Sequence, residues 1–163
     1  MRAYRVDQVI QQAYDLCGIP YRENSSSMEG SDCIGLALLF YRLMGTNIPY
    51  DNSYGYKERR AIAGKYDILL STCSLFFDMK EKESTSIFPM NLLLFQNDGR
   101  DVMTHIGVAI TGFEFLHMDR IDKVSKIDRL RSISSGFVND RSNSWDRKLR
   151  YVGKLRRGYS WVH

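Results

Sequence analysis

The chain has 163 residues, 44% of them apolar and 26% charged, and a formal net charge of +4. This length fits a single domain that buries a core without disulfides or metal. The composition is that of a soluble globular protein and excludes extensive disorder, and no stretch approaches the roughly 20 apolar residues of a transmembrane helix.

The amino-terminal residues 1–7 carry charged side chains where a secretory signal needs an apolar run. We therefore expect a chain without a signal peptide that is made in the cytoplasm, stays soluble there and does not associate with a membrane. The cysteines, Cys17, Cys33 and Cys73, are three in number, widely spaced and without a Cys-x-x-Cys pair. This pattern favours reduced thiols over a disulfide framework or a zinc knuckle.

Two helices are predicted in the amino-terminal part. Apolar side chains recur at helical spacing over residues 6–17, and Gly18 follows as a stop signal, which predicts an amphipathic helix. A polar loop over residues 21–31 comes next. Residues 32–44 are apolar almost all round, so we expect a buried central helix that ends at Gly45.

The middle of the chain has no clear period. We interpret residues 46–88 as an excursion that covers one side of the core, with a helix over residues 57–73. The charged stretch over residues 78–86 is typical of a loop.

Beyond Pro89 the pattern changes to strands. Short apolar runs separated by turn signals predict strands over residues 91–95, 106–110, 113–117 and 151–155. Helices followed by strands predict an α+β domain with a mostly antiparallel sheet. We find no repeat and no second domain, so residues 1–163 are expected to form one domain.

Residues 141–163 form a basic terminal segment with seven basic side chains, one acidic side chain and interleaved aromatic residues. Such a segment could contact nucleic acid or another anionic polymer. The simpler interpretation is a solvated surface on a terminal strand, because charged side chains commonly face water. We therefore do not expect a nucleic-acid partner.

Cys33 lies where the polar loop meets the apolar helix. A thiol at a helix start feels the positive end of the helix dipole, which favours the thiolate and predicts a pKa below the free value of about 8.5. The alternative is a packed and inert thiol, because free cysteine is among the most buried residue types.

His105 and His117 are twelve positions apart across an apparent hairpin. If the loop is residues 110–112, the pairing is centred on Thr111 and the two histidines lie opposite each other on one face. A two-residue loop would place them on opposite faces. Together with Cys33 they could supply a base and its orienter to a nucleophile, although a single histidine is more often structural.

The same three side chains are also the ligand set of a Cys-His-His zinc site. Nothing nearby in the sequence indicates a fourth ligand, so a site without metal or other cofactor is the favoured interpretation.

Four fragments occur in a fixed order, and they read Gly18-Ile19-Pro20-Tyr21, Asp32-Cys33-Ile34-Gly35-Leu36, His105-Ile106-Gly107-Val108 and Phe115-Leu116-His117. Over about residues 6–120 they resemble the NlpC cell-wall peptidase family, papain-like enzymes that cut the peptide stems of peptidoglycan. The second fragment is followed by Tyr41-Arg42 and Asn47-Ile48-Pro49, and this region is most similar to family members encoded in bacteriophage tail modules.

The resemblance implies a papain-like fold in which Cys33 is the nucleophile, His105 the general base and His117 the polar residue that orients the base. It assigns Tyr21, whose hydroxyl would lie by the thiol, to the oxyanion or substrate-binding part of the site. Asp32 belongs to the same part, as a carboxylate that the helix dipole favours. His105 would accept the thiol proton, the thiolate would attack an amide carbonyl, and the imidazolium would protonate the leaving amine.

The chain also departs from the family pattern. Arg22-Glu23-Asn24-Ser25 and Ile34 stand where many members have tryptophan, glycine and serine, and Pro89-Met90-Asn91 replaces the usual Pro-Gly-Asp. These changes leave the three candidate catalytic residues intact and alter the walls of the groove. The usual cleavage site, between D-glutamate and a diamino acid, is therefore not assumed.

The expected function is a cysteine peptidase or amidase that hydrolyses peptidoglycan stem peptides, or similar peptides, through a thioester acyl-enzyme. Phage tail components are the expected protein partners, because a wall-cutting enzyme without a secretion signal needs lysis or delivery in a particle. One alternative is a non-catalytic tail-assembly or wall-binding protein on the same fold. A thiol acyltransferase or deamidase is the other, since acceptor choice depends on the shape of the site.

Overall fold

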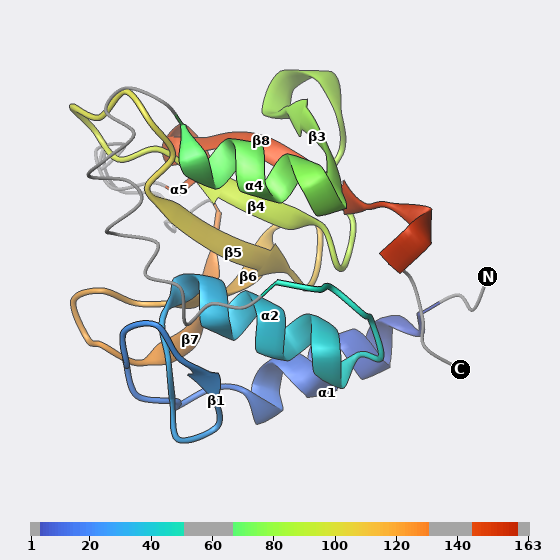
Figure 1. Ribbon diagram of the computed structural model, residues 1–163, viewed down its shortest axis with the longest axis vertical. Helices are drawn as coiled ribbons and strands as arrows, with labels where there is room; N and C mark the ends of the chain where they lie inside the picture. Colours follow the sequence, from blue (N-terminus) through green and yellow to red (C-terminus); the bar gives the residue numbers. More distant parts are fainter. Residues whose placement is uncertain (1–3, 51–66, 131–144, 160–163) are drawn as a thin grey trace, which may run out of the picture.

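A six-stranded antiparallel sheet forms the centre of the computed structural model, which describes residues 4–50, 67–130 and 145–159 (Figure 1). The strand order across the sheet is β3-β8-β4-β5-β6-β7. The strands are β3 (Phe77–Glu81), β4 (Leu92–Phe95), β5 (His105–Ala109), β6 (Glu114–Met118), β7 (Ser125–Arg129) and β8 (Leu149–Leu155). The predicted α+β class with a mostly antiparallel sheet is confirmed.

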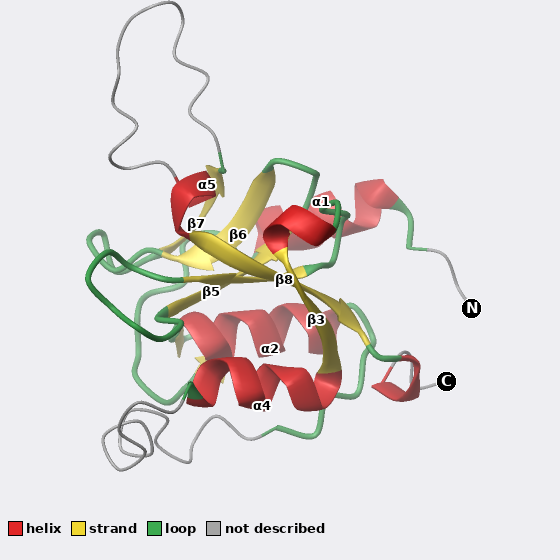
Figure 2. Cartoon of the chain, turned by 90° about the horizontal axis from the view of Figure 1, so that it is seen from above, coloured by secondary structure: helices red, strands yellow, loops and turns green. Residues whose placement is uncertain are grey.

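Helices lie on both faces of this sheet. α2 and α4 cover one face, and the short helix α5 lies on the other (Figure 2). The helices are α1 (Val6–Asp15), α2 (Cys33–Leu43), α4 (Ile68–Phe76) and α5 (Trp145–Lys148), with 3₁₀ helices η2 (Lys82–Ser84) and η4 (Arg157–Tyr159) and a small ribbon of β1 (Ser26–Ser27) and β2 (Gly30–Ser31). Within the described ranges, no helix combines the length and the apolar character needed to cross a bilayer.

The two faces of the sheet bury different apolar clusters, because successive side chains of a strand point to opposite faces. Ile106 and Val108 of β5 join the core that packs against α2. Leu93 and Phe95 of β4 belong to a second cluster, on which Trp145 of α5 packs. The sheet is thus covered on both sides, and the position of a residue along its strand decides which cluster it enters.

The sequence around α2 specifies both ends of this helix. Asp32 caps the start, since its carboxylate accepts a hydrogen bond from the backbone N–H of Gly35 at 2.7 Å. The helix ends at Leu43, and Gly45 follows with a φ of 83°, a backbone conformation that favours glycine. Most of the side chains between these ends are buried, so the predicted central helix is confirmed.

The four predicted strands are present, with bounds that differ by one or two residues, as β4, β5, β6 and β8. Residues 78–86, predicted as a loop, instead contain most of β3 and all of η2. β3 is an edge strand in which Phe77 and Met79 alternate with exposed charged side chains, but this alternation is short and runs directly into further charged residues, so it was not recognised. The edge strand β7 was missed because Ile127 is its single apolar side chain.

The helix predicted over residues 57–73 is only partly testable. Its residues 57–66 lie outside the described ranges, and the observed helix α4 begins at Ile68 and continues to Phe76. Asp67 caps this helix by accepting a hydrogen bond from the backbone N–H of Leu70 at 3.0 Å.

Candidate active site

Cys33 is the first residue of α2, and Asp32 beside it holds the loop against the helix start. One carboxylate oxygen of Asp32 caps the helix, and the other accepts a hydrogen bond from the backbone N–H of Asn24 at 2.9 Å. Both oxygens thus bind main-chain donors that fix the position of Cys33. This contact gives Asp32 a structural role in addition to its expected place at the edge of the site.

The Cys33 thiol is half-buried, and the backbone N–H of Ile106 in β5 lies against its sulfur. The pKa of Cys33 is raised to about 11, chiefly by burial and also by the neighbouring Asp32 carboxylate. The positive charge of Arg120 and the N–H groups of Ile106 and Ile34 act in the opposite direction. The pKa below 8.5 expected from the helix dipole is therefore wrong for this state of the protein, because desolvation outweighs it.

The two histidines of the β5–β6 hairpin meet as rings. Nε2 of His105 lies 2.9 Å from Nδ1 of His117, and both residues are buried, with 2% and 1% of their surface exposed. Burial lowers the pKa of His105 well below its usual value, and repulsion from His117 and Arg120 adds to the effect. Nδ1 of His105 is buried too and has no hydrogen-bond partner within the described part of the chain.

The predicted pairing of these histidines is correct in face and wrong in register. Gly107, not His105, lies opposite His117, so the hairpin is centred on Gly112 rather than Thr111. The hydroxyl of Thr111 accepts the backbone N–H of Glu114 at 3.0 Å, which fixes this later turn. When the centre of the turn moves by one residue, the residue opposite each strand position moves by two. Both histidines therefore stay on the same face of the sheet.

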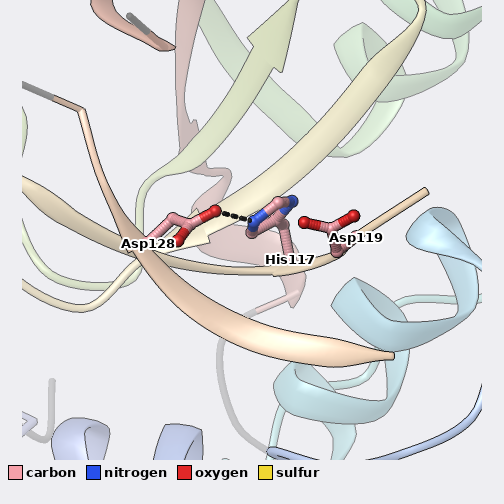
Figure 3. A group of neighbouring side chains, drawn as sticks. All are labelled: His117, Asp119 and Asp128. Atoms are coloured by element: carbon pink, nitrogen blue, oxygen red, sulfur yellow. Dashed lines mark hydrogen bonds and ion pairs between the residues drawn. The ribbon is translucent and has the colours of Figure 1, made fainter. Parts of the chain in front are cut away.

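Asp128 extends the pair of histidines to a chain of three polar side chains. Its Oδ2 lies 2.8 Å from Nε2 of His117 (Figure 3). This hydrogen bond is the largest cause of a lowered pKa of Asp128, to which the charge of Lys126 and the indole N–H of Trp145 also contribute. Sequence reasoning missed Asp128 because β7, which carries it, was not predicted.

Trp145 covers the two histidine rings on the side of the second apolar cluster. Its ring stacks on His105 with centroids 5.4 Å apart and an interplanar angle of 28°, and it meets His117 edge-on at 4.9 Å. The ammonium of Lys148 lies 5.3 Å from the centre of the Trp145 ring. Within the described residues 145–159, this aromatic side chain of the basic terminal segment therefore faces the histidines. Sequence reasoning did not select Trp145, because no local signal in the sequence links it to the histidines.

A cleft of about 530 Å³ opens in front of Cys33. Its lining combines the expected Tyr21 with polar and charged side chains and a few apolar ones: Tyr21, Glu23, Asn24, Asp32, Cys33, Ile34, Leu69, Thr104, Met118, Arg120 and Lys123. Arg120 is anchored there, because its guanidinium donates to the carbonyl oxygen of Thr104. The structure thus brings Tyr21 and Cys33 into one cleft with two cations that sequence reasoning did not select.

The described residues contain one group whose ligand atoms could hold a metal ion. The atoms of His117, Asp119 and Asp128 lie within 4.8 Å of one another, and Cys33 is not part of the group (Figure 3). Lys126 forms ion pairs with Asp119 and, at 3.8 Å, with Asp128. Its ammonium therefore already neutralises part of the negative charge of these carboxylates.

Comparison with known structures identifies the fold. The chain is similar to an NlpC/P60 family protein from Bacillus cereus, with a TM-score of 0.59 and 18% identity over 94% of this chain and 41% of that one. It is also similar to the NlpC/p60 domain of the peptidoglycan hydrolase SagA, with a TM-score of 0.53 and 14% identity over 93% of this chain and all of that domain. A third similar structure, NlpC1 from Trichomonas vaginalis, has a TM-score of 0.58 and 16% identity over 98% of this chain and 46% of its own length.

These similarities show that the chain has the NlpC/P60 fold. It spans less than half the length of the Bacillus and Trichomonas proteins and corresponds to the whole SagA domain. No protein-family model matches the chain, and no curated protein sequence matches it either.

Proposed function

We propose that this chain is a cysteine peptidase or amidase that hydrolyses peptidoglycan stem peptides, with Cys33 as nucleophile, His105 as general base and His117 as its orienter. The observation that carries the proposal is the state of the His105 ring. One of its nitrogens is bound by His117, while the other is buried and bonded to no described residue, the Cys33 sulfur included. His105 directly precedes Ile106, whose backbone N–H contacts that sulfur.

The resting pair is neutral, because burial favours the thiol form of Cys33 and the uncharged form of His105. Nδ1 of His105 accepts the thiol proton as the sulfur attacks the carbonyl carbon of the substrate. The new imidazolium then protonates the amine when the C–N bond breaks, leaving a thioester on Cys33. Water, deprotonated by the same nitrogen, hydrolyses the thioester and restores the thiol.

The oxyanion of the tetrahedral intermediate needs hydrogen-bond donors at the cleft. The backbone N–H of Cys33 at the start of α2 and the hydroxyl of Tyr21 are the donors we assign. Arg120 stabilises negative charge on the sulfur, since its guanidinium lowers the pKa of Cys33. General-base transfer within a neutral pair is thus the proposed route, rather than attack by a preformed thiolate.

The cleft suits a peptide that carries free carboxylates. Arg120 and Lys123 line it together with Glu23 and Asp32, and the carboxylate oxygens of Asp32 are engaged by main-chain N–H groups. Stem peptides of peptidoglycan carry such carboxylates, and the SagA domain that shares the fold belongs to a peptidoglycan hydrolase. Delivery in a phage tail is the proposed route to the wall, supported by the resemblance of residues 32–49 to tail-module members.

The test compares the wild type, Cys33→Ala and Cys17→Ser on purified peptidoglycan fragments, with the products identified by mass spectrometry. Cys17 is exposed and lies outside the cleft, so its variant controls for the loss of a thiol. We expect the wild type and Cys17→Ser to release the same new fragments and Cys33→Ala to release none. Identical fragment patterns from all three proteins would refute the proposal for this substrate.

A second candidate is a protein that binds the wall without cutting it, and the raised pKa of Cys33 is the observation that favours it. Sedimentation with insoluble peptidoglycan separates the two functions. Binding by both wild type and Cys33→Ala without any fragment release supports the binding function. Fragment release that only the wild type shows supports hydrolysis, and adding an amine acceptor reveals acyl transfer as a peptide–amine adduct.

A further inference from the structure

We propose that Asp128 is a positioning residue that sets the tautomer of His105 through His117, so that the His105 proton lies on Nε2 and the lone pair on Nδ1. This inference deepens the proposed function, on which it rests for its catalytic consequence, because it concerns the nitrogen assigned as the general base. It predicts a property of the resting protein that can be measured without any substrate.

The direction of the hydrogen-bond chain follows from the chemistry of its end. An ionised carboxylate can only accept hydrogen bonds, so the contact of 2.8 Å between Asp128 and Nε2 of His117 requires a proton on that nitrogen. A neutral imidazole has one donor and one acceptor, so Nδ1 of His117 must then accept. The contact of 2.9 Å from that nitrogen to Nε2 of His105 therefore requires that His105 donate.

The remaining nitrogen of His105 is the one that the candidate mechanism needs. Nδ1 is the ring nitrogen nearest the main chain, and the next backbone N–H, that of Ile106, contacts the Cys33 sulfur. It is buried and has no partner in the described residues. Without Asp128, two neutral imidazoles could pair in either direction, and half of the arrangements would place a proton on this nitrogen.

The surroundings keep the carboxylate in place and keep water away from the rings. Lys126 lies 3.8 Å from the Asp128 carboxylate, and the indole N–H of Trp145 is directed at it. The Trp145 ring stacks on His105 and meets His117 edge-on. Water that reached these nitrogens could donate to one and accept from the other, so this cover preserves the direction that Asp128 sets.

The test is nitrogen-15 NMR of the histidine rings in the full chain, where protonated and unprotonated ring nitrogens have well-separated shifts. We expect His105 to carry its proton on Nε2, with a scalar coupling across the hydrogen bond to Nδ1 of His117. Asp128→Asn keeps the shape but adds an amide donor that can reverse the chain, so we expect part or all of His105 to move its proton to Nδ1. Asp122→Asn is the matched control, because Asp122 also pairs with Lys126 but is exposed and does not contact His117.

Either of two results would overturn the inference: a wild-type His105 protonated on Nδ1, or identical tautomers in wild type and Asp128→Asn. In an active preparation, Asp128→Asn should lower kcat by about 10²-fold or more with little change in KM, since a wrong tautomer costs about 10⁴-fold in a serine protease triad. If the chain cuts no peptide, the NMR result still stands, so failure of the proposed function and failure of this inference are distinguishable.

Discussion

A Cβ atom on Gly35 would lie 1.8 Å from the carbonyl oxygen of Ser25. Real side chains do not approach a backbone oxygen so closely, so the loop that precedes α2 packs directly on the helix at the one position that has no side chain. The same loop is tied to Asp32, so Gly35 and Asp32 together determine where Cys33 lies.

We predict that Gly35→Ala destabilises the protein by about 3 kcal/mol, the upper part of the range for overpacked sites, because the obstructing atom belongs to the backbone. Chemical denaturation followed by circular dichroism measures the free energy of unfolding. Gly158→Ala is the control, since a Cβ there meets nothing within 4 Å, and we expect it to change stability by less than about 0.5 kcal/mol. Equal stabilities for the two variants would contradict the predicted clash.

The Cys33 thiol should lose its proton only at high pH in the protein without substrate. We expect the rate of its alkylation to rise with a midpoint well above the ordinary 8.5, because burial raises the pKa of Cys33 to about 11. Peptide mapping by mass spectrometry separates Cys33 from the exposed Cys17. Arg120→Gln should raise the midpoint further, since the Arg120 charge favours the thiolate. A wild-type midpoint below 8.5 would restore the thiolate interpretation made from the helix start.

The position of Cys33 could be predicted from the sequence, whereas the pKa of its thiol could not. The position of Cys33, its cap and the apolar helix behind it are local features, so the motif predicts them. The pKa of the thiol depends on how completely distant segments cover it, and one side of its surroundings comes from Ile106 and Arg120, more than seventy residues away. Local reasoning therefore finds the residue and misjudges its ionisation.

The histidine pair was predicted for a similarly local reason. Side chains alternate along strands, so an even separation places His105 and His117 on one face for every hairpin whose turn is centred on a residue, although not for one centred between two residues. Asp128 and Trp145 reach these rings only through the pairing of β7 with β6 and the return of the chain at α5. β7 has the charges of an edge strand and no apolar alternation. The hydrophobic periodicity of the sequence therefore did not reveal this strand or its residue Asp128.

We predict that Zn²⁺ leaves the thermal unfolding of the wild type unchanged. The ammonium of Lys126 forms an ion pair with Asp119 and lies 3.8 Å from Asp128, so a metal ion bound by these carboxylates would have to displace its positive charge. Lys126→Met removes that charge and should allow stabilisation, by about 2.7 kcal/mol at a Zn²⁺ concentration of one hundred times Kd. Stabilisation of the wild type, or stoichiometric metal in protein purified without chelator, would instead favour a metal site.

The buried His105 should make the protein sensitive to mild acid. The pKa of His105 is well below 6.5 in the folded protein, and unfolding returns the ring to its ordinary value. Below pH 6.5 the unfolded chain therefore binds a proton that the folded chain does not, and stability falls by up to about 1.4 kcal/mol for each pH unit. This loss precedes that from Asp119 and Asp128, whose lowered pKa values stabilise the fold until the pH falls below about 3.8.

Urea denaturation between pH 7 and 4.5 measures this dependence, and His105→Gln isolates it. The variant cannot take up the proton, so its free energy of unfolding should decline less steeply over that interval than that of the wild type, whatever its absolute stability. His163→Gln is the control, because it removes an imidazole to which no role in the site is assigned. If wild type and His105→Gln have the same slope, His105 is not the buried neutral base that the mechanism requires.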